Sequence, residues 1–412
     1  MPCHEYRGPP SLGIACVAAA TPERHEVEYV DDRVTPFDPD HETDLAALTV
    51  FTPAATRALE IARMLRARGT KVVMGGIFPS VLPEVALEHA DAIVQGEGEG
   101  VWPTLLHHAE AGCLQPRYRG QAPLDVTTLR PPRLDLYFGA ECAGHRPDDY
   151  PLQVSRGCPL SCAACVLPIV SGRQIRYYSD EYLRQTADKI VAADKRVFLC
   201  EDTSLLTSDG ARQRFRQTLE MFRNVGRAGK PLGLSYLATS VTMLAGLDLE
   251  TFQEFETLGL RRFYVVAGYD PITRRAFGGG DDKALRVAEK AINRCRAHGI
   301  DTQVSFLVGN PEDGEDVFDR ILEFARQAEL ELAEFCIATP YPGTPTWTRY
   351  QAEGRIFDFE WKRYNDANVV FRPHRMSAER LRQGYLYLWK EFYRNKPEAF
   401  IARPRAQRTI QL

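Results

Sequence analysis

The sequence predicts an α/β protein in which a doubly wound parallel sheet is followed by a partial α/β barrel. Between residues 11 and 120, short apolar runs alternate with helix-like segments, which is the rhythm of a parallel sheet covered by helices. From Leu152 onward, strand-like runs recur roughly every 35 residues, each followed by a helical pattern, which suits a barrel of six units. The length of 412 residues agrees, because about 150 residues per domain predicts two or three domains.

The same patterns divide the chain into four parts. Residues 115–150 are rich in Pro, Arg and Asp and have little apolar periodicity, which is typical of a linker. We expect a Rossmann-like domain over 1–125, a linker over 126–150, the barrel over 151–345, and a helical, aromatic-rich segment over 346–412.

Composition and charge narrow the class of protein. The net charge is −4, from 51 basic and 55 acidic residues, which disfavours nucleic acid as a partner. No apolar run approaches the roughly 18 residues of a membrane span, and no export signal opens the chain, so we expect a cytoplasmic protein without a membrane partner. Seven of the ten cysteines are scattered singly, which does not indicate a disulfide framework.

In the N-terminal part, periodicity predicts one amphipathic helix, Ala54–Arg68, and several strands. The predicted strands are Val27–Val30, Leu45–Phe51, Lys71–Met74 and Ala92–Val94. The last three are followed by loops that contain Thr52 and Arg57, Gly75 and Gly76, and Gly96 and Glu97. Glycine lets backbone amides approach a bulky or phosphate-bearing ligand, but it also occurs in turns that bind nothing, so these loops alone leave both readings open.

In the second half we expect six strands, each except the last followed by a helix. The predicted strands are 152–155, 196–200, 233–239, 262–267, 302–308 and 334–338. The predicted helices are 180–193, 210–226, 243–258, 281–298 and 314–329. A final helix is predicted from Ser377, a plausible N-cap, to Asn395.

The most specific motif is the loop Gly157–Cys165, which carries Cys158, Cys162 and Cys165 directly after the first barrel strand. A [4Fe-4S] cluster normally takes four thiolates, so three predict a cluster with one open iron. A structural zinc site would need a fourth ligand in the same sphere, and no Cys-x-x-Cys or His-x-x-x-His pair follows downstream. Three unrelated core cysteines are the other alternative.

The spacing Cys-x-x-x-Cys-x-x-Cys resembles the signature of the radical S-adenosylmethionine (SAM) superfamily. The resemblance implies that the three cysteines hold a [4Fe-4S] cluster whose open iron binds SAM. It also implies that an electron, supplied by a flavodoxin- or ferredoxin-like donor, splits SAM to a 5′-deoxyadenosyl radical. Further SAM contacts are implied at the barrel strand ends: the backbone of Ala164 and the side chains of Asp202, Ser240 and Asp270.

Three arginines, Arg156, Arg173 and Arg176, surround the cysteine loop in the sequence. They either offset the charge of a thiolate cluster and steer the SAM carboxylate, or they are solvated surface residues. The sequence leaves both readings open.

The N-terminal segments are similar in order to the cobalamin-binding domain that precedes the barrel in one branch of the superfamily. Its recurrent loops resemble Gly75–Ser80 and Gly96–Glu99 followed by Trp102-Pro103. The resemblance implies corrin contacts at Thr52, Arg57, Gly75, Gly76, Gly96 and Glu97. Two features depart from the family: the chain opens with Met-Pro-Cys-His instead of an apolar strand, and Phe78 stands where histidine is common. The alternative is a degenerate sheet kept for packing or dimerisation.

Taken together, these resemblances predict a cobalamin-dependent radical SAM methyltransferase that acts on an unactivated carbon of a small metabolite. Tyr341, in the stretch Pro340–Thr344 after the last barrel strand, is the candidate catalytic residue beside the three cysteines. Two rival functions stay open. One is a radical oxidation, rearrangement or cyclisation without methyl transfer, and the other is a non-catalytic iron-sulfur or corrinoid-binding partner of another enzyme.

Overall fold

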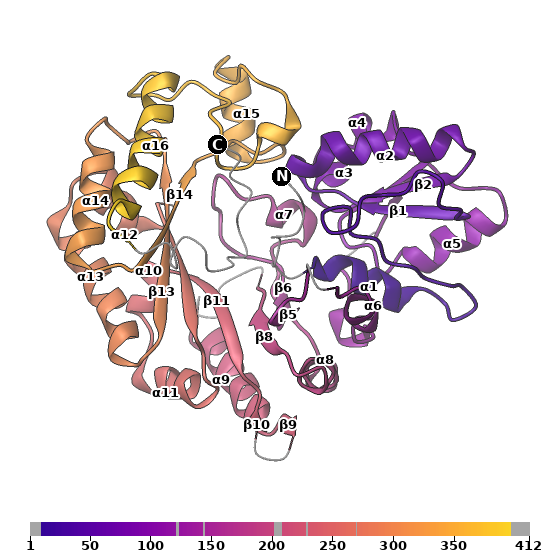
Figure 1. Cartoon of the computed structure of the whole chain (residues 1–412), viewed down its shortest axis with the longest axis horizontal. Helices are drawn as coiled ribbons and strands as arrows, with labels where there is room; N and C mark the ends of the chain where they lie inside the picture. Colours follow the sequence, from indigo (N-terminus) through magenta and orange to yellow (C-terminus); the bar gives the residue numbers. More distant parts are fainter. Residues whose placement is uncertain are drawn as a thin grey trace.

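The computed structural model describes residues 10–120, 123–142, 145–201, 208–227, 230–268 and 270–396. Two parallel sheets organise these residues, one of four strands and one of six (Figure 1). Within the described ranges, no helix is long and apolar enough to span a membrane.

The N-terminal sheet has the order β1-β2-β3-β4, with every pair parallel. Its strands are β1 (Leu45–Thr49), β2 (Lys71–Gly75), β3 (Ala92–Gln95) and β4 (Arg117–Arg119). Its helices are α1 (Leu12–Ala20), α2 (Ala55–Ala67), α3 (Ile77–Val81), α4 (Pro83–Leu87) and α5 (Trp102–Glu110), and a 3-10 turn, η2 (Thr52–Ala54), precedes α2. Val72 and Met74 of β2 pack towards α2 to α4, whereas Val73 packs towards α5 and α1. Helices therefore cover both faces, as the predicted doubly wound sheet requires.

The strand predicted over Val27–Val30 is wrong. The segment has no strand partner among the described residues, although its side chains alternate between half-buried and exposed as in a strand. One reason for the alternation is that Tyr29 packs on Tyr137, with ring centroids 4.6 Å apart. Alternation of half-buried and exposed side chains therefore indicates an extended segment with one covered face. Such a segment becomes a β-strand only where a neighbouring strand hydrogen-bonds to it.

The second sheet has the order β14-β13-β12-β11-β8-β5, so consecutive parallel strands curve into a barrel open between the first and the last. The strands are β5 (Asp149–Leu152), β8 (Arg196–Leu199), β11 (Leu234–Ser240), β12 (Arg262–Ala267), β13 (Asp301–Val308) and β14 (Leu332–Ile337). Short antiparallel pairs join β6 (Ser155–Arg156) to β7 (Arg176–Tyr177), and β9 (Gly226–Arg227) to β10 (Lys230–Pro231). The predicted partial barrel is confirmed, with its first strand three residues earlier than expected.

Helices cover the outer face of this barrel (Figure 1). They are α8 (Asp180–Ala192), α9 (Asp209–Arg223), α10 (Val241–Ala245), α11 (Leu249–Thr257), α12 (Pro271–Thr273), the π turn η4 (Arg274–Gly278), α13 (Asp282–Ala297) and α14 (Val317–Gln327). The helix predicted over 243–258 is two helices, because Asp248 accepts a hydrogen bond from Thr251 N and starts α11 anew.

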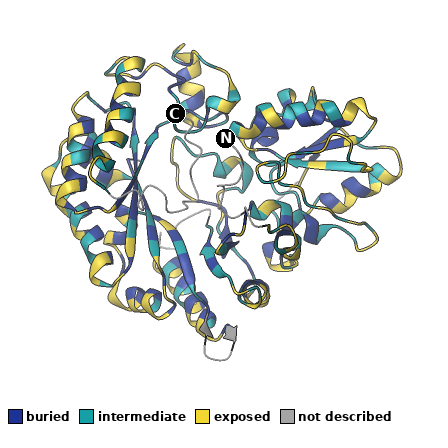
Figure 2. Ribbon diagram, in the orientation of Figure 1, coloured by how far each residue is buried: buried dark blue, intermediate teal, exposed yellow. Residues whose placement is uncertain are grey.

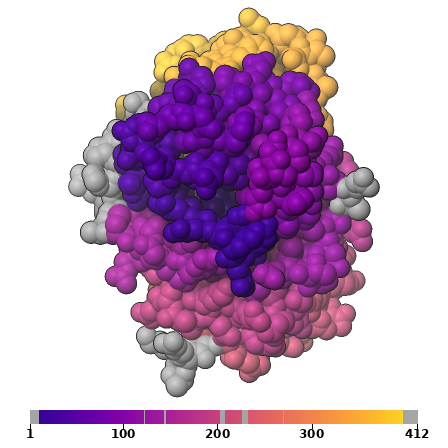
Figure 3. All heavy atoms as spheres, turned by 90° about the vertical axis from the view of Figure 1, so that its right-hand side faces the viewer, coloured from indigo at the N-terminus to yellow at the C-terminus, as the bar shows by residue number. Residues whose placement is uncertain are grey.

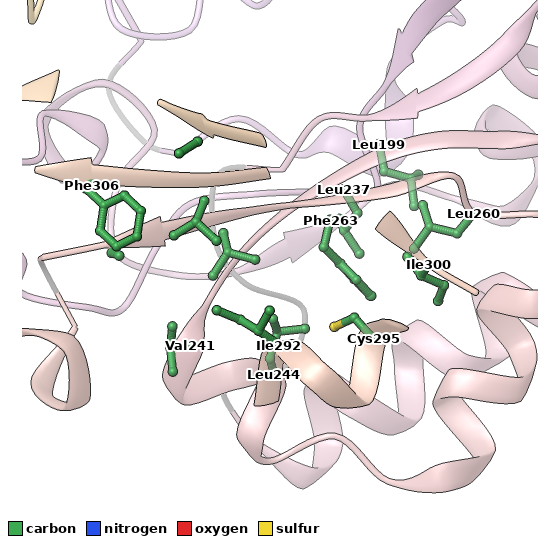
Figure 4. Close-up of a cluster of buried hydrophobic side chains, with 14 of the residues drawn as sticks. Leu199, Leu237, Val241, Leu244, Leu260, Phe263, Ile292, Cys295, Ile300 and Phe306 are labelled. Atoms are coloured by element: carbon green, nitrogen blue, oxygen red, sulfur yellow. The ribbon is translucent and has the colours of Figure 1, made fainter. Parts of the chain in front are cut away.

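The main core lies between the second sheet and its helices, where buried faces meet (Figure 2). Leu237 and Phe263 of the sheet point towards Ile292 and Cys295 of α13 (Figure 4). Burial raises the pKa of the Cys295 thiol to about 12, so this cysteine is a packing residue.

Residues before and after the barrel tie the two sheets together. Before it come η3 (Val126–Thr128) and α6 (Asp135–Gly139), and the cysteine loop leads into α7 (Leu167–Val170). After it come α15 (Pro345–Ala352), η5 (Trp361–Arg363) and α16 (Ala378–Tyr393), which begins at the predicted N-cap Ser377. The Tyr393 hydroxyl donates to Ala333 O at 2.6 Å, and Ile337 N donates to Asp366 O at 2.7 Å, so the C-terminal segment covers the edge strand β14.

This segment also reaches the N-terminal domain (Figure 3). Trp361 packs edge-on against Phe78 of α3, with ring centroids 5.8 Å apart, and it contacts the cores of both sheets. The chain after the barrel therefore bridges the two domains at one side of their interface.

Candidate active site

The cysteine loop begins where the backbone turns sharply after β6. Gly157 has φ +89°, and a Cβ there would lie 2.2 Å from Gln174 O, so only glycine fits. Cys158 N donates to Gly172 O at 3.1 Å, and Cys165 N donates to Cys162 O at 3.2 Å. The first contact ties the start of the loop to the segment that leads into β7, and the second closes a turn within the loop.

The three thiols differ in exposure: Cys158 is buried, Cys165 is half-buried and Cys162 is exposed. Although the Cys162 residue as a whole is exposed, partial desolvation of its thiol, and then the nearby thiol of Cys158, raise its pKa, so the two thiols interact. Within the described ranges, no three His, Cys, Asp or Glu side chains meet around a single point as one metal ion requires. Three thiolates from one short loop can each bind a different iron atom of a [4Fe-4S] cluster, whereas a structural zinc ion takes four ligands itself.

Thr346, at the start of α15, anchors the middle of this loop. Its backbone N and its Oγ1 both donate to Ala163 O, each at 2.9 Å. Arg173 adds donors to Leu160 O at 3.4 Å and Ser161 Oγ at 3.3 Å. The backbone next to Ala164, the predicted SAM contact, is therefore fixed from the C-terminal segment. In the sequence, nothing marks Thr346 beyond its place two residues after Thr344.

At the carboxyl ends of the N-terminal strands, the predicted corrin-binding loops lie close to one another. The Ser80 hydroxyl donates to Gly76 O at 2.7 Å and accepts from Gly96 N at 2.9 Å, which links the loops after β2 and β3. Gly75 ends β2, and Thr52 is buried at the start of η2. These loops offer a hydroxyl and backbone amides that a bulky or phosphate-bearing ligand can approach, so they fit cobalamin in kind, and the individual contacts stay predictions.

Two of the predicted glycines are required by protein contacts. Gly76 has φ +98°, and a Cβ there would lie 3.1 Å from the backbone of Val50. Gly96 has φ +75°, and its Cβ would lie 3.3 Å from Val170 O in α7, directly after the cysteine loop. The loops of the first domain therefore touch the barrel beside the predicted cluster.

The two predicted charged contacts of the corrin have protein partners. Arg57 donates to the Asp32 carboxylate at 2.8 and 2.9 Å on the surface. Glu97 accepts from Arg176 at 2.6 and 2.7 Å in a nearly buried pair. A role for either side chain on cobalamin stays a prediction.

Arg156 and Arg176 are not the solvated surface residues that one reading of the sequence allowed. Arg156 is nearly buried and pairs with Glu99, which sequence reasoning missed. Burial opposes the charge of Glu99, but Arg156 outweighs this effect and lowers the pKa of the Glu99 carboxyl.

At the barrel strand ends, two predicted SAM contacts cap helices. Ser240 accepts from Met243 N at the start of α10. Asp270 accepts from Ile272 N at 3.1 Å at the start of α12 and from the Thr242 hydroxyl at 2.8 Å. Capping is an ordinary role for a Ser or Asp that directly precedes a helix, and it keeps both side chains at the mouth of the barrel. Asp202 lies outside the described residues.

The predicted catalytic Tyr341 lies at the same mouth and donates its hydroxyl to Asp366, which also accepts from Thr339. Burial raises the pKa of Asp366 to about 6. Asp366 has φ +61° and belongs to the segment that covers β14. This Tyr–Asp pair joins residues 25 positions apart, and sequence reasoning missed its acid.

A cavity of about 360 Å³ lies between α1, α5, α8 and residues 128–130 and reaches Glu99, the partner of Arg156. Its walls include Cys16, Glu99, Arg130 and Tyr182, and none of the predicted site residues. A site at the meeting of the cysteine loop, the N-terminal strand ends and the barrel mouth stays a prediction.

Comparison with protein families assigns both domains. The family described as B12 binding domain matches residues 7–106, and the radical SAM superfamily matches residues 152–325. The bacteriochlorophyllide d C-8(2)-methyltransferase of Chlorobaculum tepidum is 28% identical over 92% of this chain and 86% of its own length. The C-12(1)-methyltransferase of the same organism is 24% identical over 93% of this chain and 82% of its own length.

Solved structures agree on the fold. The cobalamin-dependent SAM radical enzyme OxsB matches 92% of this chain and 64% of its own, with a TM-score of 0.68 at 15% identity. The radical SAM methyltransferase TsrM from Kitasatospora setae matches 76% of this chain and 66% of its own, with a TM-score of 0.59 at 17% identity. This chain thus spans about two thirds of the length of these enzymes. It belongs to the radical SAM enzymes that carry a B12-binding domain, and its cofactors are a [4Fe-4S] cluster, SAM and cobalamin.

Proposed function

We propose that this enzyme methylates an unactivated carbon of a small metabolite. Support comes from relatives named as methyltransferases that align with more than nine tenths of the chain. When bound, the cluster and SAM supply a radical that removes hydrogen from carbon, and cobalamin supplies the methyl group. Bacteriochlorophyllide d, named for both relatives, is the first compound to test as a substrate.

The observation that carries the proposal is the contact between the two sets of loops. Gly96 of the N-terminal domain lies against Val170, five residues after the last cysteine. Gly343, two residues after Tyr341, is so close to α3 that a Cβ would lie 2.7 Å from Val81. A substrate held between these loops meets both cofactor-binding regions, which a methyl transfer between them requires.

The chain's own residues have three tasks in this proposal. Cys158, Cys162 and Cys165 bind the cluster, and Thr346 orients their loop. Tyr341 orients the substrate, and its hydroxyl proton is held by the Asp366 carboxylate. Trp361, packed on Phe78, excludes water from one side of the domain interface.

The test is anaerobic purification with cobalamin supplied, followed by reaction with SAM that carries a deuterated methyl group. We expect about four iron atoms and one cobalt per chain, formation of 5′-deoxyadenosine, and a product that gains one labelled methyl. Replacing the three loop cysteines by alanine should abolish 5′-deoxyadenosine. Cys113→Ala, at an exposed cysteine outside the loop, is the matched control and should leave 5′-deoxyadenosine formation unchanged.

Other outcomes would replace the proposal. A product that loses hydrogen without gaining the label indicates an oxidation or cyclisation. Absence of 5′-deoxyadenosine from a fully loaded protein indicates a non-catalytic partner of another enzyme.

A further inference from the structure

Two nearly buried ion pairs connect the domains beside the cysteine loop. Arg176 forms a two-pronged contact with Glu97 at 2.6 and 2.7 Å, and Arg156 forms one with Glu99 at 2.5 and 3.2 Å. The four side chains are only 6 to 11% exposed. A third contact, Arg156 to Glu97 at 3.7 Å, joins the two pairs into one network, here called the interdomain clamp.

The clamp connects the two loops that the reaction must bring together. Arg156 and Arg176 face each other across the β6–β7 pair, and Arg156 directly precedes Gly157 and Cys158. Glu97 and Glu99 follow β3 in the loop that starts at Gly96. Each ion pair therefore joins the base of the cysteine loop to a strand end of the N-terminal sheet.

The interdomain clamp is better explained by the geometry that it imposes on the two loops than by a gain in folding stability. Burying four charges costs desolvation free energy that the ion pairs offset only in part, so apolar residues would serve simple packing as well. Planar guanidinium groups with two bonds each fix the distance and the angle of their partners, which apolar contacts do not. The clamp thus holds the two loops in one relative position.

Hydrogen bonds to the backbone also hold the charged side chains of the clamp in place. Glu97 also accepts from Leu124 N at 3.2 Å, and Arg176 donates to Leu124 O at 2.7 Å and to Ser171 O at 2.5 Å. The chain segment between the domains and the end of α7 are therefore tied to the same charges. Movement of either loop would break several hydrogen bonds at once.

We propose that Glu97 and Glu99 are positioning residues that set the distance and orientation between the cluster loop and the cobalamin-binding loops. This inference rests on the proposed function. It gives Glu97 a task in holding the domains together in place of a contact with the corrin. Loss of the clamp should leave SAM cleavage intact and uncouple it from methyl transfer, because the first needs only the barrel and the second needs both domains.

The variant that tests this is Glu99→Gln, which removes one charge without changing the shape of the side chain and lies outside the barrel. A misplacement of about 1 Å can reduce a rate about 100-fold. We expect the ratio of methylated product to 5′-deoxyadenosine to fall at least tenfold, with iron content and 5′-deoxyadenosine formation changed less than twofold. Glu110→Gln, which breaks the exposed pair with Arg24 in the same domain, is the control and should leave the ratio unchanged.

A second measurement, amide hydrogen exchange of the full chain without substrate, tests the clamp separately from the chemistry. Exchange at residues 96–100 and 170–176 should accelerate in Glu99→Gln and not in Glu110→Gln. Unchanged exchange at these residues in Glu99→Gln overturns the inference. An unchanged ratio of methylated product to 5′-deoxyadenosine in Glu99→Gln, if the variant makes product, overturns it as well. A third outcome separates the two proposals. If the wild-type enzyme transfers no methyl group but exchange still accelerates in Glu99→Gln, the clamp is supported and only the proposed methylation is refuted.

Discussion

Substitution of Gly157 tests the geometry on which the cysteine loop depends. In Gly157→Ala the new Cβ would lie 2.2 Å from Gln174 O, and the residue would keep φ +89°. The left-handed backbone costs alanine roughly 1–2 kcal/mol, and the overpacking adds about 1–3 kcal/mol. Gly172→Ala is a matched control in the same connection between β6 and β7, because Gly172 has φ +76° but nothing within 4 Å of its Cβ position.

The assay compares the thermal unfolding midpoint and the iron content of both variants after anaerobic reconstitution. The overpacking alone separates them, and at about 2–4 °C per kcal/mol it should lower the midpoint of Gly157→Ala by a further 2 to 12 °C, approximately. Gly157→Ala should also lose iron, because the backbone must move where Cys158 begins. Equal midpoints and equal iron contents in the two variants would refute this account of the loop.

Three further predictions concern other parts of the molecule. Thr346→Val should lower the rate of 5′-deoxyadenosine formation a fewfold by removing a net hydrogen bond of about 1 kcal/mol, whereas Thr346→Ser should restore it. Burial raises the pKa of Asp313 to about 6 from 3.8, so its contribution favours the folded state below about pH 4 and is lost as the pH rises towards 6. Asp313→Asn should therefore gain up to about 3 kcal/mol relative to wild type between pH 4 and pH 7 in denaturant titrations, and a constant difference would contradict this. Gly384→Ala should destabilise the protein, since its Cβ would lie 2.1 Å from Phe318. Gly210→Ala, the control in open space, should be neutral or stabilising by about 0.5–1 kcal/mol. Equal thermal unfolding midpoints of the two variants would argue against close packing of α16.

The parts of the fold that the sequence predicted are those with local signals. The barrel strands are short apolar runs at regular spacing, and the cysteine motif lies within nine residues, so both are visible without knowledge of distant contacts. The break at Asp248 was missed because the apolar pattern continues across it. Val27–Val30 was wrongly predicted as a strand, because a strand needs a hydrogen-bonded partner and the residues of the segment do not show whether one is present.

For the candidate site, the sequence predicts the cysteine motif and the strand-end loops, but not the distant partners of their side chains. Glu99 pairs with Arg156, 57 positions later, and Asp366 pairs with Tyr341 across a turn and a helix. An acidic residue in a glycine-rich loop looks the same in the sequence whether it faces a ligand or a distant arginine. The side chains of Ser240 and Asp270 have the same ambiguity, because a helix cap and a ligand contact use the same polar atoms.

The position of the C-terminal segment bears on how the enzyme matures. Residues 361–393 seal the edge of β14 and bridge to Phe78 of α3, yet they leave the ribosome after every strand of both sheets. Since domains generally fold as they are synthesised, the two sheets can form while this side of their interface is still open. Nascent chains would thus pass through an unsealed stage, in which insertion of bulky prosthetic groups meets less obstruction than in the finished enzyme.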